Sequence, residues 1–219
     1  MKNKNKSIYN ENIHSSNEEM DMTEMTEIES DFDINSPEYL FKQVDYGINI
    51  DNEIIYLHGP IVNCETLYNI MQAINIITRY RLPEEANKPI SISINSGGGD
   101  VLEMLGIIDY LATLPMKVNI ICRGQACSAA AWILVTATGI RAMSKNSTLM
   151  LHEGTYSIED KFNSMKSSIG YFGYLEEVGY KMLTDKTKIE ESFWREKCKV
   201  DWYLTAEEAL KIKLIDKII

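Results

Sequence analysis

The sequence predicts an α/β fold in which a mostly parallel sheet is covered by helices. Short apolar runs at 53–59, 89–95 and 117–124 each end in a glycine or a polar turn, and each is followed by a segment with helical periodicity. Three such units in a row favour parallel strands joined by right-handed crossovers. With 219 residues, of which 45% are hydrophobic, the chain can bury one sizeable core.

The first unit pairs a strand at 53–59 with a helix over 61–80, for which Asn63 is the expected N-cap. The helix is predicted from apolar residues at helical spacing, namely Leu67, Ile70, Met71, Ile74 and Ile77.

The second and third units contain the two unusual turns of the chain. The strand at 89–95 is broken by SGGGD (96–100) before a helix over 101–114, and the strand at 117–124 leads through GQACS to an alanine-rich helix after Ser128. Both turns fall at the carboxyl edge of the predicted sheet, where ligands bind in such folds.

The last third of the chain is expected to contain two short strands, 139–145 and 147–153, and a long polar helix over 157–186 that offers a partner surface. Three glycines are expected to weaken this helix: Gly170, Gly173 and Gly179. Two capping boxes, Thr187 with Glu190 and Thr205 with Glu208, predict two more helices, with Asp201 in the turn between them.

Residues 1–36 are predicted to be a flexible acidic tail, with a pro-segment or an interaction arm as open alternatives, leaving 37–219 as a single domain. The tail carries nine acidic residues against three lysines and has no steady period. A net charge of −10 argues against nucleic acid as a partner. The sequence has neither a long apolar run nor a secretory signal. We therefore expect no membrane association and a cytoplasmic location.

The four cysteines lack the spacing of a metal site and are expected to be buried, reduced thiols: Cys64, Cys122, Cys127 and Cys198. No metal or cofactor is expected.

Ser128 is a candidate nucleophile because it follows a strand and begins a helix, where backbone N–H groups stabilise negative charge. Of the three histidines, His14 lies in the tail and His58 lies in an apolar strand, where a core role is expected. His152 ends a strand at the carboxyl edge, and Asp201 in its turn could orient the imidazole.

These residues lie in four blocks that resemble the proteolytic subunit of the Clp protease. GQACS resembles the nucleophile turn of that family, TLMLHEG its histidine strand, VDWYLTAEEALKIKLID its aspartate turn, and INSGGGD its Asn–Ser–Pro–Gly–Gly loop. The resemblance covers about residues 50–219. It implies a crotonase-like fold with a protruding handle helix, and a self-compartmentalised serine endopeptidase.

Residue by residue, the resemblance implies Ser128 as nucleophile, His152 as general base and then acid, and Asp201 as its orienting partner. The oxyanion hole would be formed by the main-chain N–H groups of Gly99 and Ala129, with Gly98 close by.

The implied substrates are polypeptides, unfolded or delivered by a partner. The implied assembly is a heptameric ring, or two rings in a tetradecamer, with an AAA+ Clp ATPase as a further partner. Leu67, Ile70 and Ile74 are expected to pack against neighbouring subunits.

The sequence departs from the family pattern at several positions. Gly97 occupies the proline position, and Glu153 and Gly154 replace Gln–Pro. A glycine-rich strand is not recognisable after His152, and the axial-loop sequence at the N-terminus is absent, so ring pairing and ATPase docking do not follow from the motifs.

Three other functions remain open. One is a catalytically inactive assembly subunit. Another is an acyl-CoA lyase or isomerase of the crotonase type, which would place carboxylates at the reacting carbon. The third is a membrane-associated relative with a Ser/Lys dyad, against which His152 argues.

Overall fold

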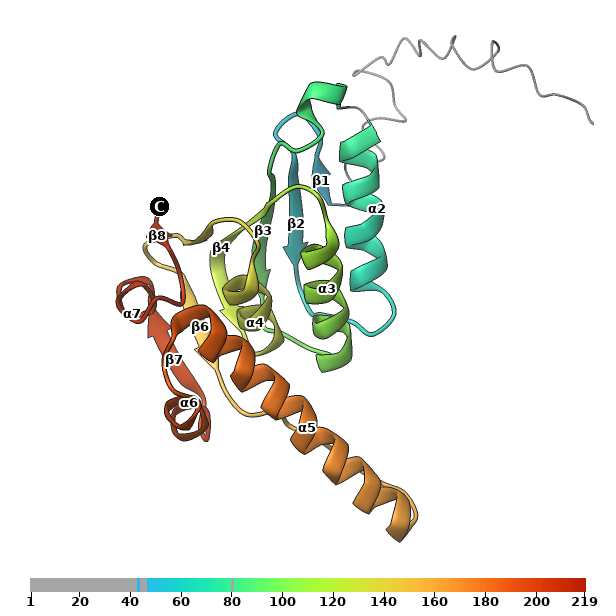
Figure 1. Cartoon of the computed structure of the whole chain (residues 1–219), viewed down its shortest axis with the longest axis vertical. Helices are drawn as coiled ribbons and strands as arrows, with labels where there is room; N and C mark the ends of the chain where they lie inside the picture. The colour runs from blue at the N-terminus through green and yellow to red at the C-terminus, as the bar shows by residue number, and fades with distance from the viewer. Residues whose placement is uncertain (1–42, 44–46, 80) are drawn as a thin grey trace, which may run out of the picture.

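The computed structural model describes residue 43 and residues 47–79 and 81–219. These residues form one eight-stranded sheet with helices packed on it (Figure 1). The acidic tail and its boundary at residue 37 lie outside the described residues and remain predictions. In the described part of the chain, no helix is both long and apolar enough to cross a membrane.

The centre of the sheet confirms the predicted parallel arrangement. Strands β2 (Ile54–His58), β3 (Ile90–Ser96) and β4 (Val118–Cys127) pair in parallel. The crossovers between them are α2 (Thr66–Arg79), which a short 3₁₀ turn follows, and α3 (Val101–Thr113). Both glycine-containing turns therefore lie at the carboxyl edge, as expected.

Strand β4 has different partners along its two halves. Its first half pairs with β5 (Arg141–Met143), and its second half pairs with β6 (Thr148–Leu151), both in parallel. Between the two halves the register with β3 shifts, and the side chain of Asn95 accepts a hydrogen bond of 3.2 Å from Gln125 N. The two predicted short strands thus both lie beside β4, and the end of β6 lies close to the end of β4.

Three short strands were not predicted from the sequence. They are β1 (Ile48–Asn49), β7 (Trp202–Thr205) and β8 (Lys217–Ile218), and β7 pairs antiparallel with β6. Such short segments show too few periods to stand out. Asp201 consequently precedes a strand, β7, and lies between it and α6 (Glu191–Lys197).

The first helix begins later than predicted, and Asn63 does not cap it. Helix α2 starts at Thr66. The N–H groups of Cys64 and Leu67 donate to the buried carboxylate of Glu103, which belongs to α3. A side chain distant in the sequence therefore accepts the hydrogen bonds of backbone N–H groups at the start of this helix, which have no acceptor within the helix.

One of the two predicted capping boxes is wrong. Thr187 is the last residue of α5 (Phe162–Thr187), and Glu190 stands at the N-cap of α6 without a side-chain bond. The other is confirmed, because Thr205 and Glu208 exchange both bonds at the start of α7 (Ala206–Lys211).

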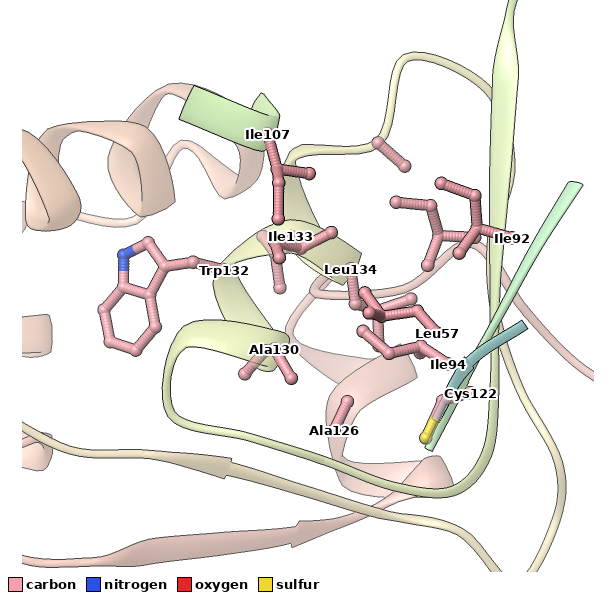
Figure 2. Close-up of a cluster of buried hydrophobic side chains, with 14 of the residues drawn as sticks. Leu57, Ile92, Ile94, Ile107, Cys122, Ala126, Ala130, Trp132, Ile133 and Leu134 are labelled. Atoms are coloured by element: carbon pink, nitrogen blue, oxygen red, sulfur yellow. The ribbon is translucent and has the colours of Figure 1, made fainter. Parts of the chain in front are cut away.

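The core lies between the sheet and the helices, and α4 (Ala129–Thr136) passes through it. Figure 2 shows Ala130, Ile133 and Leu134 of this helix beside side chains from the strands. The stretch from Ala129 to Val135 is wholly buried. Its alanines allow the close packing that the short helix requires.

Helix α5 projects from the body, as the handle prediction requires (Figure 1). Its buried residues all lie in the C-terminal half: Leu175, Gly179, Tyr180, Leu183 and Thr187. The projecting half exposes large apolar side chains, namely Phe162, Ile169, Tyr171 and Tyr174.

The apolar face of α2 corrects one expectation about assembly. Ile70 and Ile74 are each 2% exposed because they face the protein's own core. The expectation that they pack against a neighbouring subunit is therefore wrong for Ile70 and Ile74, while Leu67 is partly buried against the same core.

Candidate functional site

Ser128 occupies a sharp turn between β4 and α4. Its backbone has φ 54° and ψ −131°, a conformation that costs a non-glycine residue about 1–3 kcal/mol. A hydrogen bond of 2.9 Å from Ser128 N to Met150 O, on β6, ties the turn to the neighbouring strand. The turn presents the hydroxyl at the start of α4, where the helix dipole favours negative charge.

The three predicted catalytic side chains lie in one hydrogen-bonded chain. His152 Nε2 lies 2.8 Å from Ser128 Oγ, and His152 Nδ1 lies 3.1 Å from Asp201 Oδ1. The carboxylate can only accept, so Nδ1 carries the proton and Nε2 is free to accept from the serine hydroxyl. The His152 side chain is 23% exposed and that of Asp201 is 56% exposed.

Strand pairing explains this convergence. Ser128 follows β4, His152 follows β6 and Asp201 precedes β7, and β6 pairs with both other strands. Because β7 runs antiparallel to β6, its start lies beside the end of β6. An activated serine beside a base and an orienting carboxylate can perform nucleophilic acyl transfer.

The SGGGD loop packs directly against the serine turn. A Cβ on Gly98, which has φ 96°, would lie 2.7 Å from the Cβ of Ser128 and 3.0 Å from Ala129 N. A Cβ on Gly99, with φ 152°, would lie within 2.9 Å of the backbone nitrogen of Ile61. Only glycine allows both this close approach and these dihedral angles.

Three backbone N–H groups of this region differ in their bonding. Gly98 N donates to the buried hydroxyl of Ser96 at 3.1 Å. Ile61 bonds to Gly98 O and Asp100 N, so the N–H of Gly99 between them points away from Ile61. Within the described residues, Gly99 N donates to no acceptor, and neither does the N–H of Ala129, which is the first residue of α4.

The other histidines are not part of this cluster. His58 is exposed on β2, which corrects the expectation of a core role, and its Nε2 lies 3.5 Å from Ser93 Oγ. His14 lies outside the described residues.

The cysteines are poor nucleophiles in this environment. Burial, followed by the charge of Asp201, raises the pKa of the Cys127 thiol, and its Sγ lies 3.7 Å from Gln125 Oε1. Burial also raises the pKa of Cys122 and of Cys198 to about 12. Cys64 is exposed, so the prediction of four buried thiols holds for three of them.

A pocket beside Ser128 and His152 was not predicted from the sequence. Its apolar wall comes from α3, α4 and α5, namely Val101, Met104, Trp132, Leu175 and Tyr180. Further lining residues come from the segment after β6 and from α5: Glu153, Gly154, Tyr156, Glu176 and Gly179. The one available signal was a tryptophan in an otherwise alanine-rich and aliphatic helix. In the described ranges, no group of three or more His, Cys, Asp or Glu side chains is arranged to hold a metal ion.

Comparison with known proteins agrees with this geometry. The family model described as Clp protease matches residues 42–219. The ATP-dependent Clp protease proteolytic subunit 1 of Prochlorococcus marinus is 26% identical over 175 residues, which cover 80% of this chain and 87% of that protein.

Two further relatives carry the name ATP-dependent Clp protease proteolytic subunit. The protein of Borrelia garinii is 27% identical over 80% of this chain and 88% of its own length. The protein of Bacteroides thetaiotaomicron is 30% identical over 62% of each chain. The family match spans every residue that the structure describes, and together with these relatives it leads to one conclusion: the chain belongs to the Clp protease family and is a serine endopeptidase of that type.

Proposed function

We propose that Ser128, His152 and Asp201 are the catalytic triad with which this endopeptidase hydrolyses peptide bonds. The observation that carries the proposal is the continuous chain from Ser128 Oγ through His152 to Asp201, with distances of 2.8 and 3.1 Å. The acyl-CoA lyase and the inactive subunit have no specific observation in their favour.

In the proposed reaction, Ser128 Oγ attacks the substrate carbonyl carbon while its proton passes to His152 Nε2. Asp201 stabilises the imidazolium and keeps Nδ1 protonated. The C–N bond then breaks as His152 returns the proton to the leaving amine. Water, activated in turn by His152, hydrolyses the acyl-enzyme and regenerates the serine.

The proposed oxyanion hole consists of the N–H groups of Gly99 and Ala129. Two observations support this assignment: neither N–H group donates to an acceptor within the described residues, and the glycine loop packs against the serine turn. Gly98 is less suited, because its N–H already donates to Ser96 Oγ. Two preorganised donors of this kind stabilise the charge of the tetrahedral intermediate.

The proposed substrates are unfolded or partner-delivered polypeptides, hydrolysed inside an oligomer of the family's type. We propose a heptameric ring, or two such rings, with an AAA+ Clp ATPase as the partner; the relatives' names describe an ATP-dependent protease. A cytoplasmic location is part of the same proposal.

A fluorophosphonate probe tests the triad. Labelling is expected at Ser128 and is expected to vanish in Ser128→Ala, together with the hydrolysis of short peptides. Asp201→Asn is expected to lower kcat by about 10⁴, because the imidazole is then held in the wrong tautomer. Cys127→Ala serves as the matched control and should retain labelling. Labelling at any other residue, or near-normal hydrolysis by Ser128→Ala, would refute the assignment.

A further inference from the structure

Trp132 lines the pocket beside Ser128, and its indole carries a hydrogen-bond donor without a partner in the described part of the chain. The residue is 7% exposed, and its Nε1 is one of two buried side-chain N or O atoms in the described residues that have no hydrogen-bond partner. Buried polar groups in folded proteins are nearly always paired. An unpaired indole N–H on a residue that lines a substrate pocket therefore points to an acceptor that arrives with the ligand.

Gly179 of α5 determines where this donor lies. A Cβ at position 179 would be 2.9 Å from Trp132 Nε1, so the indole reaches the surface of α5 only because residue 179 has no side chain. Figure 2 shows the indole nitrogen on the side away from the labelled core residues. Trp132 and Gly179 both line the pocket, next to Ser128 and His152.

The same stretch of α5 contributes an acidic side chain to the pocket. Glu176 lies one helical turn before Gly179 and accepts a hydrogen bond from Gly154 N. Burial and then the charge of Glu153 raise the pKa of Glu176, while the Gly154 bond and the charge of Arg195 lower it. Two carboxyl groups at this wall disfavour a substrate side chain that carries a negative charge, and a carboxylate accepts hydrogen bonds from amide N–H groups.

We propose that this pocket selects a long, uncharged side chain that ends in a carbonyl acceptor, of which glutamine is the protein example, at the residue whose carbonyl Ser128 attacks. The indole Nε1 of Trp132 donates to the carboxamide oxygen, the apolar wall covers the methylene groups, and the carboxyl groups face the amide nitrogen. This inference rests on the proposed function, since it assigns a substrate preference to that site.

The test uses short peptides that differ only at this residue, which is Gln, Met or Glu. Methionine matches glutamine in length but is a weak acceptor. The ratio of kcat/KM for Gln over Met is expected to be about ten, the effect of one net hydrogen bond. In Trp132→Phe, which keeps an aromatic ring but removes the N–H, the ratio is expected to fall to about one. The ratio does not depend on the fraction of active enzyme, so partial misfolding of the variant does not affect it.

The outcomes separate this inference from the proposed function. Hydrolysis with Met preferred to Gln, a ratio unchanged in Trp132→Phe, or cleavage after Glu as fast as after Gln would each overturn the inference and leave the triad intact. Absence of both hydrolysis and probe labelling would refute the triad and, with it, this inference.

Discussion

Ser128 combines a strained backbone with a side chain held by His152. The turn has positive φ at a residue that bears a Cβ, and the glycine loop packs against that Cβ. Strain of this kind persists only where the surrounding structure imposes it, here through Met150 O and the start of α4. A cysteine stands one position earlier, yet burial and the Asp201 charge raise the pKa of its thiol. Position and environment together therefore single out the serine.

The strain leads to a stability prediction at residue 128. Ser128→Gly and Ser128→Ala both lose the hydroxyl, but only glycine relaxes at φ 54°. Relief of the strain outweighs the added entropy of glycine in the unfolded chain, so Ser128→Gly is expected to be about 1 kcal/mol more stable than Ser128→Ala.

Urea denaturation of both variants at one protein concentration measures the difference. Equal stability, or a more stable alanine variant, would show that the turn is not strained.

At the scale of elements, Glu103 joins the starts of two helices. It lies in the first turn of α3, where its own N–H donates to Asp100 Oδ1. Its carboxylate, in a residue only 7% exposed, accepts from Leu67 N at 2.6 Å and from Cys64 N at 3.0 Å. Since α3 begins directly after the SGGGD loop, this contact also helps to position the proposed oxyanion donors.

Removal of this acceptor is expected to destabilise the fold. Glu103→Ala leaves two N–H groups without their partner and should lower the free energy of unfolding by about 2–4 kcal/mol. Glu103→Gln, which keeps one carbonyl oxygen, should lose roughly half as much. Urea denaturation at a fixed protein concentration measures both losses, and equal losses in the two variants would contradict this role of the carboxylate.

At the scale of the whole molecule, the projecting half of α5 carries apolar side chains away from the body. The projecting half exposes four large apolar side chains on one helix, whereas Ile70 and Ile74 of the body face its core. Exposed apolar surface of this extent on a projecting element is typical of an interaction site. A helix that docks one ring on another requires such exposed apolar side chains.

Light scattering tests the assembly. A mass of fourteen subunits is expected for paired rings, and the double substitution Ile169→Ser with Tyr171→Ser is expected to reduce it to seven by removing apolar contacts. Gly170→Ala, on the same helix and with open space around its Cβ, keeps the apolar side chains and serves as the control. A stable, active monomer would contradict the proposed ring.

The sequence by itself determined the parallel strand–helix units, the positions of the two glycine-containing turns, the projecting helix and the order of Ser128, His152 and Asp201. These features depend on local periodicity and on residues whose dihedral angles or chemistry are distinctive, so they can be read without knowing what lies nearby. The capping box at Thr205 was predictable for the same reason, since all its contacts lie within four residues.

Only the tertiary structure decided how these parts meet. The two halves of β4 and the antiparallel strand β7 bring three separate turns together, and β7 is too short to have been recognised. The cap supplied by Glu103 and the contact of Trp132 with Gly179 likewise join residues from different helices. Periodicity assigns a residue to an element and a face, whereas a contact between elements depends on their mutual packing, which no local pattern encodes.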